Sequence, residues 1–426
     1  MTESASQLLL FGLSLALPVG LFGLRQSASR LGSNLGDRLH AILSPGNVAA
    51  ISGISIGLSV FPAVAGVIDD SASFLMLFVS VWCGFTVGCG IDLRALRKTS
   101  SILLASQLGQ CIVAMLAIPL LTYLLKYLPW AQESVLFSPG ALLITACMCL
   151  SEGVMGSPER DHRQLVGGIG RAFPKPSIAA FVAILLASLG GGQDPMGSTH
   201  VAALSFLSGP SFTWSISGIG ELILAGLFMG CGAGLLSDLA AKDHSSTGMT
   251  FCVFSGVLLL VSGISVVFGV QPLMIGVMAG VWLINATLRR LDVHHVVDRS
   301  RGLSSVGVPF LLGWILGFGI VTRGISGEGF LAGLCLILAI RPIVRIAGWR
   351  LGEYLIKAKN PQALSREGES LLFDNSGFLI AVVLVTVISG PVGVGFLAAA
   401  LVSQLVFAAI SRWSPSMTAV DASLAR

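Results

Sequence analysis

The stretch that decides the fold reads Ala72-Ser-Phe-Leu-Met-Leu-Phe-Val-Ser-Val-Trp-Cys-Gly-Phe-Thr-Val-Gly-Cys-Gly-Ile91, and Asp92, Arg94, Arg97 and Lys98 follow it at once. An apolar run of about twenty residues is long enough to cross a bilayer as a helix. The whole chain has this character, because 54% of its 426 residues are hydrophobic, 11% are charged, and the mean hydropathy is +0.88. Soluble domains carry about 25% charged residues, so the composition excludes a water-soluble enzyme or binding module. Disorder, which needs low hydrophobicity and high charge, is excluded as well. The apolar runs are also too long and too continuous for the alternating strands of about ten residues that build membrane barrels. The sequence predicts an all-α polytopic membrane protein.

Apolar runs separated by charged or Gly/Pro-rich breaks predict thirteen transmembrane helices. They cover residues 7–24, 46–66, 72–91, 101–125, 139–156, 172–190, 214–236, 249–268, 272–288, 305–322, 328–345, 370–389 and 393–411. Apart from Lys126, Lys175 and Arg323, all 25 Lys and Arg residues fall in or beside the odd-numbered breaks or the C-terminal tail. Because cytoplasmic loops are enriched in Lys and Arg, we expect the N-terminus outside and the C-terminus in the cytoplasm, in a multi-pass protein of the cytoplasmic (inner) membrane. The segment after Met1 lacks a basic n-region, so no cleaved signal peptide is expected.

The predicted organisation is a single membrane domain over residues 1–426. No loop is long enough for a soluble domain, although Arg350 to Glu369 is expected to form a short helix at the membrane surface. Charged interruptions in the fifth and sixth helices and in the eleventh and twelfth fall at corresponding places in the two halves. This pattern is typical of inverted six-helix repeats whose two broken helices cross at a substrate site. The halves are predicted at 7–190 and 249–411, with a linker helix at 214–236 and a short cytoplasmic tail at 412–426.

Ionisable side chains inside apolar spans are costly and are therefore candidates for function. Glu152 follows Ser151 at the end of an apolar run, before Gly153 and Pro158. A helix broken in this way exposes backbone groups that are tolerated where they line a cavity. Ser151 and Glu152 are predicted either to form part of an ion or proton site or to mark a helix that simply ends at the inner surface.

Three further positions leave similar alternatives open. Lys175, between two prolines, either lines the translocation site as a counter-charge or snorkels from the first turn of a helix. Arg341, before Pro342, either pairs with a carboxylate or stays near the interface. Asp374 and Asn375 either coordinate a cation or cap a half-helix, where a carboxylate also gains from the dipole.

Other residue types point away from metal or redox chemistry. The eight cysteines all fall in apolar stretches without paired spacing, so they are interpreted as packing residues. The six histidines are all predicted in loops, and His294-His295 resembles a metal pair only weakly. Glu221 is expected to be wet or snorkelling at the outer end of the seventh helix.

Four motifs, in this order, resemble those of the monovalent cation:proton antiporters, the sodium/proton exchanger-type membrane domain. They are Gly53-Ile-Ser-Ile-Gly57; Cys83-Gly-Phe-Thr-Val-Gly-Cys-Gly-Ile-Asp-Leu-Arg-Ala-Leu-Arg97; Phe268-Gly-Val-Gln-Pro-Leu-Met-Ile-Gly-Val-Met-Ala-Gly280; and Arg341-Pro342 with Arg345-Ile-Ala-Gly-Trp-Arg-Leu-Gly352. The resemblance spans about residues 7–411. It implies thirteen helices with an outside N-terminus, a dimerising panel, and a moving core in which the fifth and twelfth helices cross.

This chain departs from the family pattern where the ions bind. The acidic pair of the family's sixth helix is absent, and the corresponding stretch reads Phe173-Pro174-Lys175-Pro176. The resemblance carries over only Ser151, Glu152 and Arg341, whereas Asp374, Asn375 and Lys175 are proposed from position alone.

The expected function is proton-coupled antiport of a monovalent cation, Na⁺ or K⁺, with no cofactor, no enzymatic activity and no nucleic-acid partner. Ser151, Glu152, Asp374 and Asn375 would bind the ion or the proton, and Lys175 and Arg341 would compensate charge. Two alternatives stay open, namely transport of an anion or neutral solute on the same scaffold, and a relative that does not transport.

Overall fold

The structure of this chain is a computed structural model that describes residues 20–21, 23–24, 43–59, 65–96, 105, 107–114, 116, 219–242, 246–268, 270–335, 337–338, 341–356 and 390–410. The secondary structure within these ranges is helical. The helices are α3 (Pro45–Ser59), α4 (Ala65–Cys89), α5 (Leu93–Leu96), α11 (Ile219–Ala241), α12 (Thr247–Phe268), α13 (Pro272–Ala286), α14 (Arg290–Arg323), α15 (Gly327–Cys335), α16 (Arg341–Ile356) and α19 (Gly390–Ile410).

Helices α3 and α14 cross at paired glycines. Gly53 and Gly57 of α3 lie against Gly313 and Gly317 of α14. A Cβ atom on Gly57 would lie 2.8 Å from the backbone nitrogen of Phe318, so the position has no room for a side chain. Small residues four apart let the backbones of membrane helices approach closely, and here both helices supply them.

Helices α4 and α13 repeat this arrangement. Gly84 and Gly88 lie against Gly276 and Gly280, and a Cβ atom on Gly280 would lie 2.7 Å from the nitrogen of Cys89. In both crossings the contacts advance along the two chains in the same direction, so the helices of each pair are parallel.

The other face of α13 packs against α11. Three glycines of α11, spaced four residues apart, each contact one side chain of α13. The pairs are Gly226 with Met274, Gly230 with Met278, and Gly234 with Trp282. Helix α11 then pairs with α12. The core cluster that joins α4, α11, α12, α13 and the start of α14 includes Trp82, Phe85, Phe254, Leu258, Ile275, Leu283, Ile284, Val293, Val296 and Val297.

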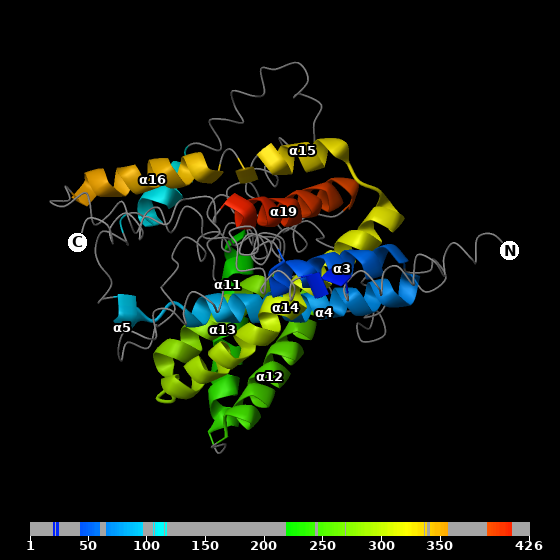
Figure 1. The fold of residues 1–426 in the computed structure, drawn as a ribbon. Coiled ribbons are helices and arrows are strands. Elements are labelled where there is room, and N and C mark those ends of the chain that lie inside the picture. Colours follow the sequence, from blue (N-terminus) through cyan, green and yellow to red (C-terminus); the bar gives the residue numbers. More distant parts are fainter. Residues whose placement is uncertain are drawn as a thin grey trace, which may run out of the picture.

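Helices α15, α16 and α19 lie on the opposite side of the central helices from α11 and α12 (Figure 1). Gly395 of α19 fits against α15, where a Cβ atom would lie 2.7 Å from the carbonyl oxygen of Ser326, and Gly319 of α14 receives the Val394 side chain. Gly109, in the helical stretch 107–114, lies against Gly348 and Gly352 of α16.

The structure corrects several predicted helix boundaries. The linker helix predicted at 214–236 continues to Ala241, and α4, predicted to begin at 72, already includes Ala65. Both differences have one cause, since the prediction followed apolar residues, while backbone hydrogen bonding continues past the end of an apolar run. Predicted helices at 139–156, 172–190 and 370–389 lie outside the described residues.

Two described helices fall in the stretch predicted as a helix at 328–345, since α15 ends at Cys335 and α16 begins at Arg341. Proline has no N–H and its ring clashes with the carbonyl four residues earlier, so it is tolerated in the first turn of a helix and not in its interior. Pro342 therefore starts a helix. Helix α16 continues to Ile356 and so includes the first part of the surface helix predicted at Arg350 to Glu369.

The predicted loop before the tenth helix is also wrong, since α14 begins at Arg290 and includes His294 and His295. Val293, Val296 and Val297 are buried on one face of this extension. Their spacing of three and four residues is the helical signal that an apolar-run criterion overlooks.

Three of the described helices are long and apolar enough to cross a membrane, with spans at Ile223–Ala241, Gly248–Ser265 and Val306–Arg323. Shorter apolar helices occur at Leu75–Cys89, Pro272–Ala286 and Val394–Ser403. The chain is thus a mostly helical membrane protein in the part that the structure describes.

Candidate functional site

Most of the predicted site falls beyond the described part of the chain. Ser151, Glu152, Lys175, Asp374 and Asn375 lie outside the described residues. The backbone of Arg341 begins α16, and its side chain is also outside what the structure describes.

The buried polar side chains that the structure describes are uncharged. They are Asn47, Ser52, Ser80, Gln107, Gln110, Ser237, Thr250, Ser262, Ser265, Thr287 and Ser403. Several hydroxyls donate to a carbonyl in the preceding turn of their own helix, as Ser52 does to Val48 O at 2.7 Å. Proton exchange needs a group that titrates, so these residues do not supply a proton site.

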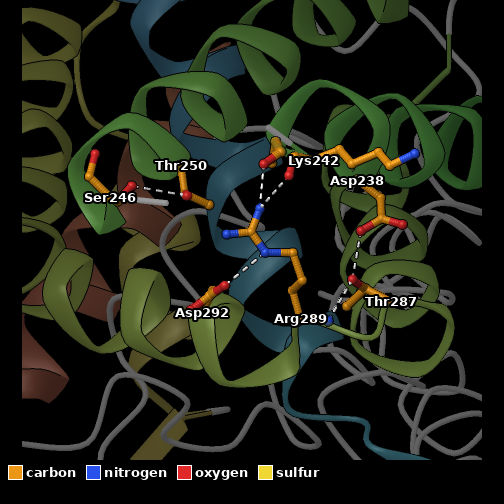
Figure 2. Close-up of polar contacts among 8 residues, drawn as sticks. Asp238, Lys242, Ser246, Thr250, Thr287, Arg289 and Asp292 are labelled. Carbon is orange, nitrogen blue, oxygen red and sulfur yellow. Dashed lines mark hydrogen bonds and ion pairs between the residues drawn. The ribbon is translucent and has the colours of Figure 1, made fainter. Parts of the chain in front are cut away.

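A polar cluster joins the end of α11, the start of α12, the end of α13 and the start of α14 (Figure 2). At its centre, the Arg289 guanidinium donates from Nη1 to the carbonyl oxygens of Ala241 and Lys242, and from Nε to Asp292 Oδ2 at 2.9 Å. The last carbonyls of a helix have no partner within it, and a cation there also complements the helix dipole. Arg289 therefore caps the C-terminal end of α11, although it lies 48 positions after Ala241 in the sequence.

Two hydroxyl residues complete the cluster. The Thr287 hydroxyl donates to Asp238 Oδ1 at 2.6 Å, which ties the end of α13 to α11. Ser246 precedes α12, and its Oγ accepts the backbone N–H of Met249 at 3.3 Å, as an N-cap residue does.

Asn285 makes a second tie beside this cluster. Its Nδ2 donates to Ile91 O at 2.9 Å and to Val281 O at 2.8 Å, and its Oδ1 accepts the backbone N–H of Leu93 at 2.9 Å. The amide thus satisfies backbone groups at the turn between α4 and α5.

We interpret the cluster and the Asn285 tie as structural. Each carboxylate engages a donor of the protein, and the described residues contain no group of three or more His, Cys, Asp or Glu side chains that could hold a metal ion. His295 is exposed on α14. Glu221 is exposed in the first turn of α11, in agreement with its expected wet position.

The cysteine prediction holds only in part. Cys83, Cys89 and Cys111 are buried, whereas Cys252 and Cys335 are exposed and do not pack in the core. An apolar neighbourhood in the sequence does not say which face of a membrane helix a residue occupies.

Sequence reasoning missed Arg289, Asn285 and Thr287. A signal for Arg289 exists, since it stands in a short polar break between two apolar runs, where a cation can reach the end of another helix. The identity of that other helix, α11, is not encoded locally.

Comparison with known proteins reveals a likeness of fold. No protein-family profile matches the chain, and no curated protein sequence does. The structure of the sodium proton antiporter MjNhaP1 from Methanocaldococcus jannaschii at pH 8 is similar over 93% of this chain and 96% of that chain, with a TM-score of 0.51 and 16% identity. At this identity the likeness establishes a shared fold.

Proposed function

We propose that this protein is a secondary active transporter that exchanges a monovalent cation, Na⁺ or K⁺, for protons by alternating access. The observation that carries the proposal is the fold likeness to a sodium proton antiporter over nearly the whole of both chains. The protein would act as a multi-pass homodimer in the cytoplasmic membrane, with the N-terminus outside and the C-terminus inside. It would need no cofactor beyond the transported ions.

The proposed site combines Ser151 and Glu152 with Asp374 and Asn375. We propose that the titrating groups come from these carboxylates, since the buried polar side chains that the structure describes are neutral. Competition between a cation and protons for the same negative charge would couple the two fluxes. Lys175 and Arg341 would compensate the charge of the pocket.

Two features of the described helices support the two inverted halves. Helices α3 and α13 are the second helix of each predicted half, and α4 and α14 are the third. Exchanging the halves therefore converts the α3–α14 crossing into the α13–α4 crossing, and both use Gly-x-x-x-Gly on both partners. Each crossing is parallel, as expected for helices separated by an odd number of intervening spans.

The test is ion exchange by the purified protein in liposomes. A pH-sensitive dye inside the vesicles reports proton movement when Na⁺, K⁺ or halide salts are added outside. The double variant Glu152→Gln/Asp374→Asn should abolish cation-dependent proton flux. The matched control is Glu221→Gln, which neutralises an exposed glutamate of α11 and should leave the flux unchanged. Undiminished exchange by the double variant would reject the site.

A second candidate, transport of an anion or neutral solute, has one observation in its favour. Lys175 stands where the resemblance places an acidic pair, which would shift the site toward positive potential. In the same liposomes, halide-dependent flux without cation dependence would favour this candidate. A Lys175→Asp variant that gains cation dependence would support it further. Absence of flux with every solute would instead favour a relative that does not transport.

A further inference from the structure

Two leucine–arginine pairs lie on either side of Asn285, where α4 and α13 end and α14 begins. Leu93 donates its backbone N–H to Asn285 Oδ1 at 2.9 Å, and Arg94 follows it in α5. Arg290 donates from Nη2 to Asn285 O at 3.2 Å, and Leu288 precedes it by two residues. Leu93, Arg94, Leu288 and Arg290 are named here the Leu–Arg patch.

The leucines of the patch are exposed without apolar cover. Leu288 is 101% exposed and Leu93 is 54% exposed. Moving a leucine side chain from water into an apolar contact gains about 1.5–3 kcal/mol. An apolar contact outside the described chain would provide this gain.

The arginines of the patch carry positive charge. Arg94 is exposed, and within the described residues neither Arg94 nor Arg290 forms an ion pair. Two carboxylates lie nearby in the sequence: Asp92 accepts the backbone N–H of Arg94, and Asp292 pairs with Arg289. Guanidinium groups bind phosphate oxygens through paired hydrogen bonds.

We propose that the Leu–Arg patch binds one anionic phospholipid. Its phosphate would lie between Arg94 and Arg290, and its first acyl carbons would contact Leu93 and Leu288. Apolar side chains beside basic ones are the composition of segments that sit at a membrane interface. The patch also lies where two shorter apolar helices end, at Leu75–Cys89 and Pro272–Ala286. The inference rests on the proposed orientation, because that orientation places this end of the helices at the cytoplasmic leaflet, where anionic lipids gather.

The test is lipid retention by the purified full-length protein in detergent, measured by native mass spectrometry. Phosphatidylglycerol and phosphatidylcholine with the same acyl chains are titrated separately. We expect one retained phosphatidylglycerol that phosphatidylcholine does not match. The variant Arg94→Gln/Arg290→Gln should bind it roughly ten- to thirty-fold more weakly. Leu288→Asn should weaken it to a smaller degree. Inorganic phosphate at millimolar concentration should not displace the lipid, because it makes no acyl contact.

The single variant Arg94→Gln tests the site without removing a structural contact, since no hydrogen bond of the Arg94 guanidinium occurs in the described part of the chain. It should still weaken lipid binding several-fold. Lys242→Gln is the matched control. It removes an exposed cation at the same end, and Figure 2 shows its side chain extending away from Arg289. An equal loss of phosphatidylglycerol binding with Lys242→Gln would mean that the lipid responds to surface charge in general, and it would overturn the site. Equal retention of both lipids, or displacement by phosphate alone, would overturn it too. The measurement needs no ion gradient, so failure of transport and failure of lipid binding are separate results.

Discussion

At the scale of single residues, side chains far apart in sequence satisfy the backbone at the ends of helices. Arg289 caps the last carbonyls of α11, and Asn285 satisfies the turn after α4. Unsatisfied backbone groups are expensive near a bilayer, where little water is available to replace the missing partner. These contacts hold α4, α11, α13 and α14 together at one end.

Replacing Arg289 by glutamine should destabilise the protein by about 1–3 kcal/mol, because the capped carbonyls of α11 lose a charged donor. The shift in thermal unfolding of the detergent-solubilised protein measures this. Asp292→Asn removes only the partly exposed ion pair and should cost less than about 1 kcal/mol. If Asp292→Asn destabilised the protein as much as Arg289→Gln, the cap would not be the important contact.

At the scale of helices, the motifs that resemble the antiporter family are contact points between backbones. Gly53 and Gly57, Gly84 and Gly88, and Gly276 and Gly280 all lie in helix crossings. Gly348 and Gly352 lie against the helical stretch at 107–114. These motifs therefore encode packing, which explains how a chain can share a fold while its proposed ion-binding residues differ from the family pattern.

Gly84→Ala should destabilise the protein by about 1–3 kcal/mol, because the new methyl group would meet the backbone of α13 at Leu273 and Val277. Gly256→Ala is the same change on the exposed face of α12, where no atom lies within 4 Å of the added Cβ. It should be neutral or stabilising by up to about 1 kcal/mol, since alanine favours helix over glycine. Thermal unfolding of the two variants side by side checks the contrast, and equal shifts would contradict the crossing.

At the scale of the whole molecule, parallel crossings link helices from the two halves of the chain. The α3–α14 and α4–α13 pairs each join an early helix to a late one. The early and late helices of the described chain are therefore packed against one another.

The orientation of the whole molecule gives a prediction of its own. An epitope tag at the N-terminus should be accessible to protease in intact cells, and a tag at the C-terminus should become accessible only after permeabilisation. The reason is the concentration of Lys and Arg in the odd-numbered loops. Permeabilised cells, in which both tags must be cleaved, provide the control. Protection of the N-terminal tag in intact cells would contradict this orientation and would place the N-terminus in the cytoplasm.

The sequence by itself determined that this is a helical membrane protein, because apolar runs of membrane length can satisfy their backbone only as helices. It also located most of the described helices to within several residues, but it missed the charged start of α14. The site prediction, built on Glu152 and Asp374, rests on isolated charges in apolar segments and remains a prediction.

Only the tertiary structure decided which helices pair and which glycines lie in the crossings. Gly256 and Gly84 have similar apolar neighbours in the sequence, yet one is exposed and the other has no room for a methyl group. Every face of a membrane helix is apolar, so hydropathy does not distinguish a lipid contact from a helix contact. The partner of Arg289 was equally hidden, because the end of α11 reaches it through folding and not through sequence proximity.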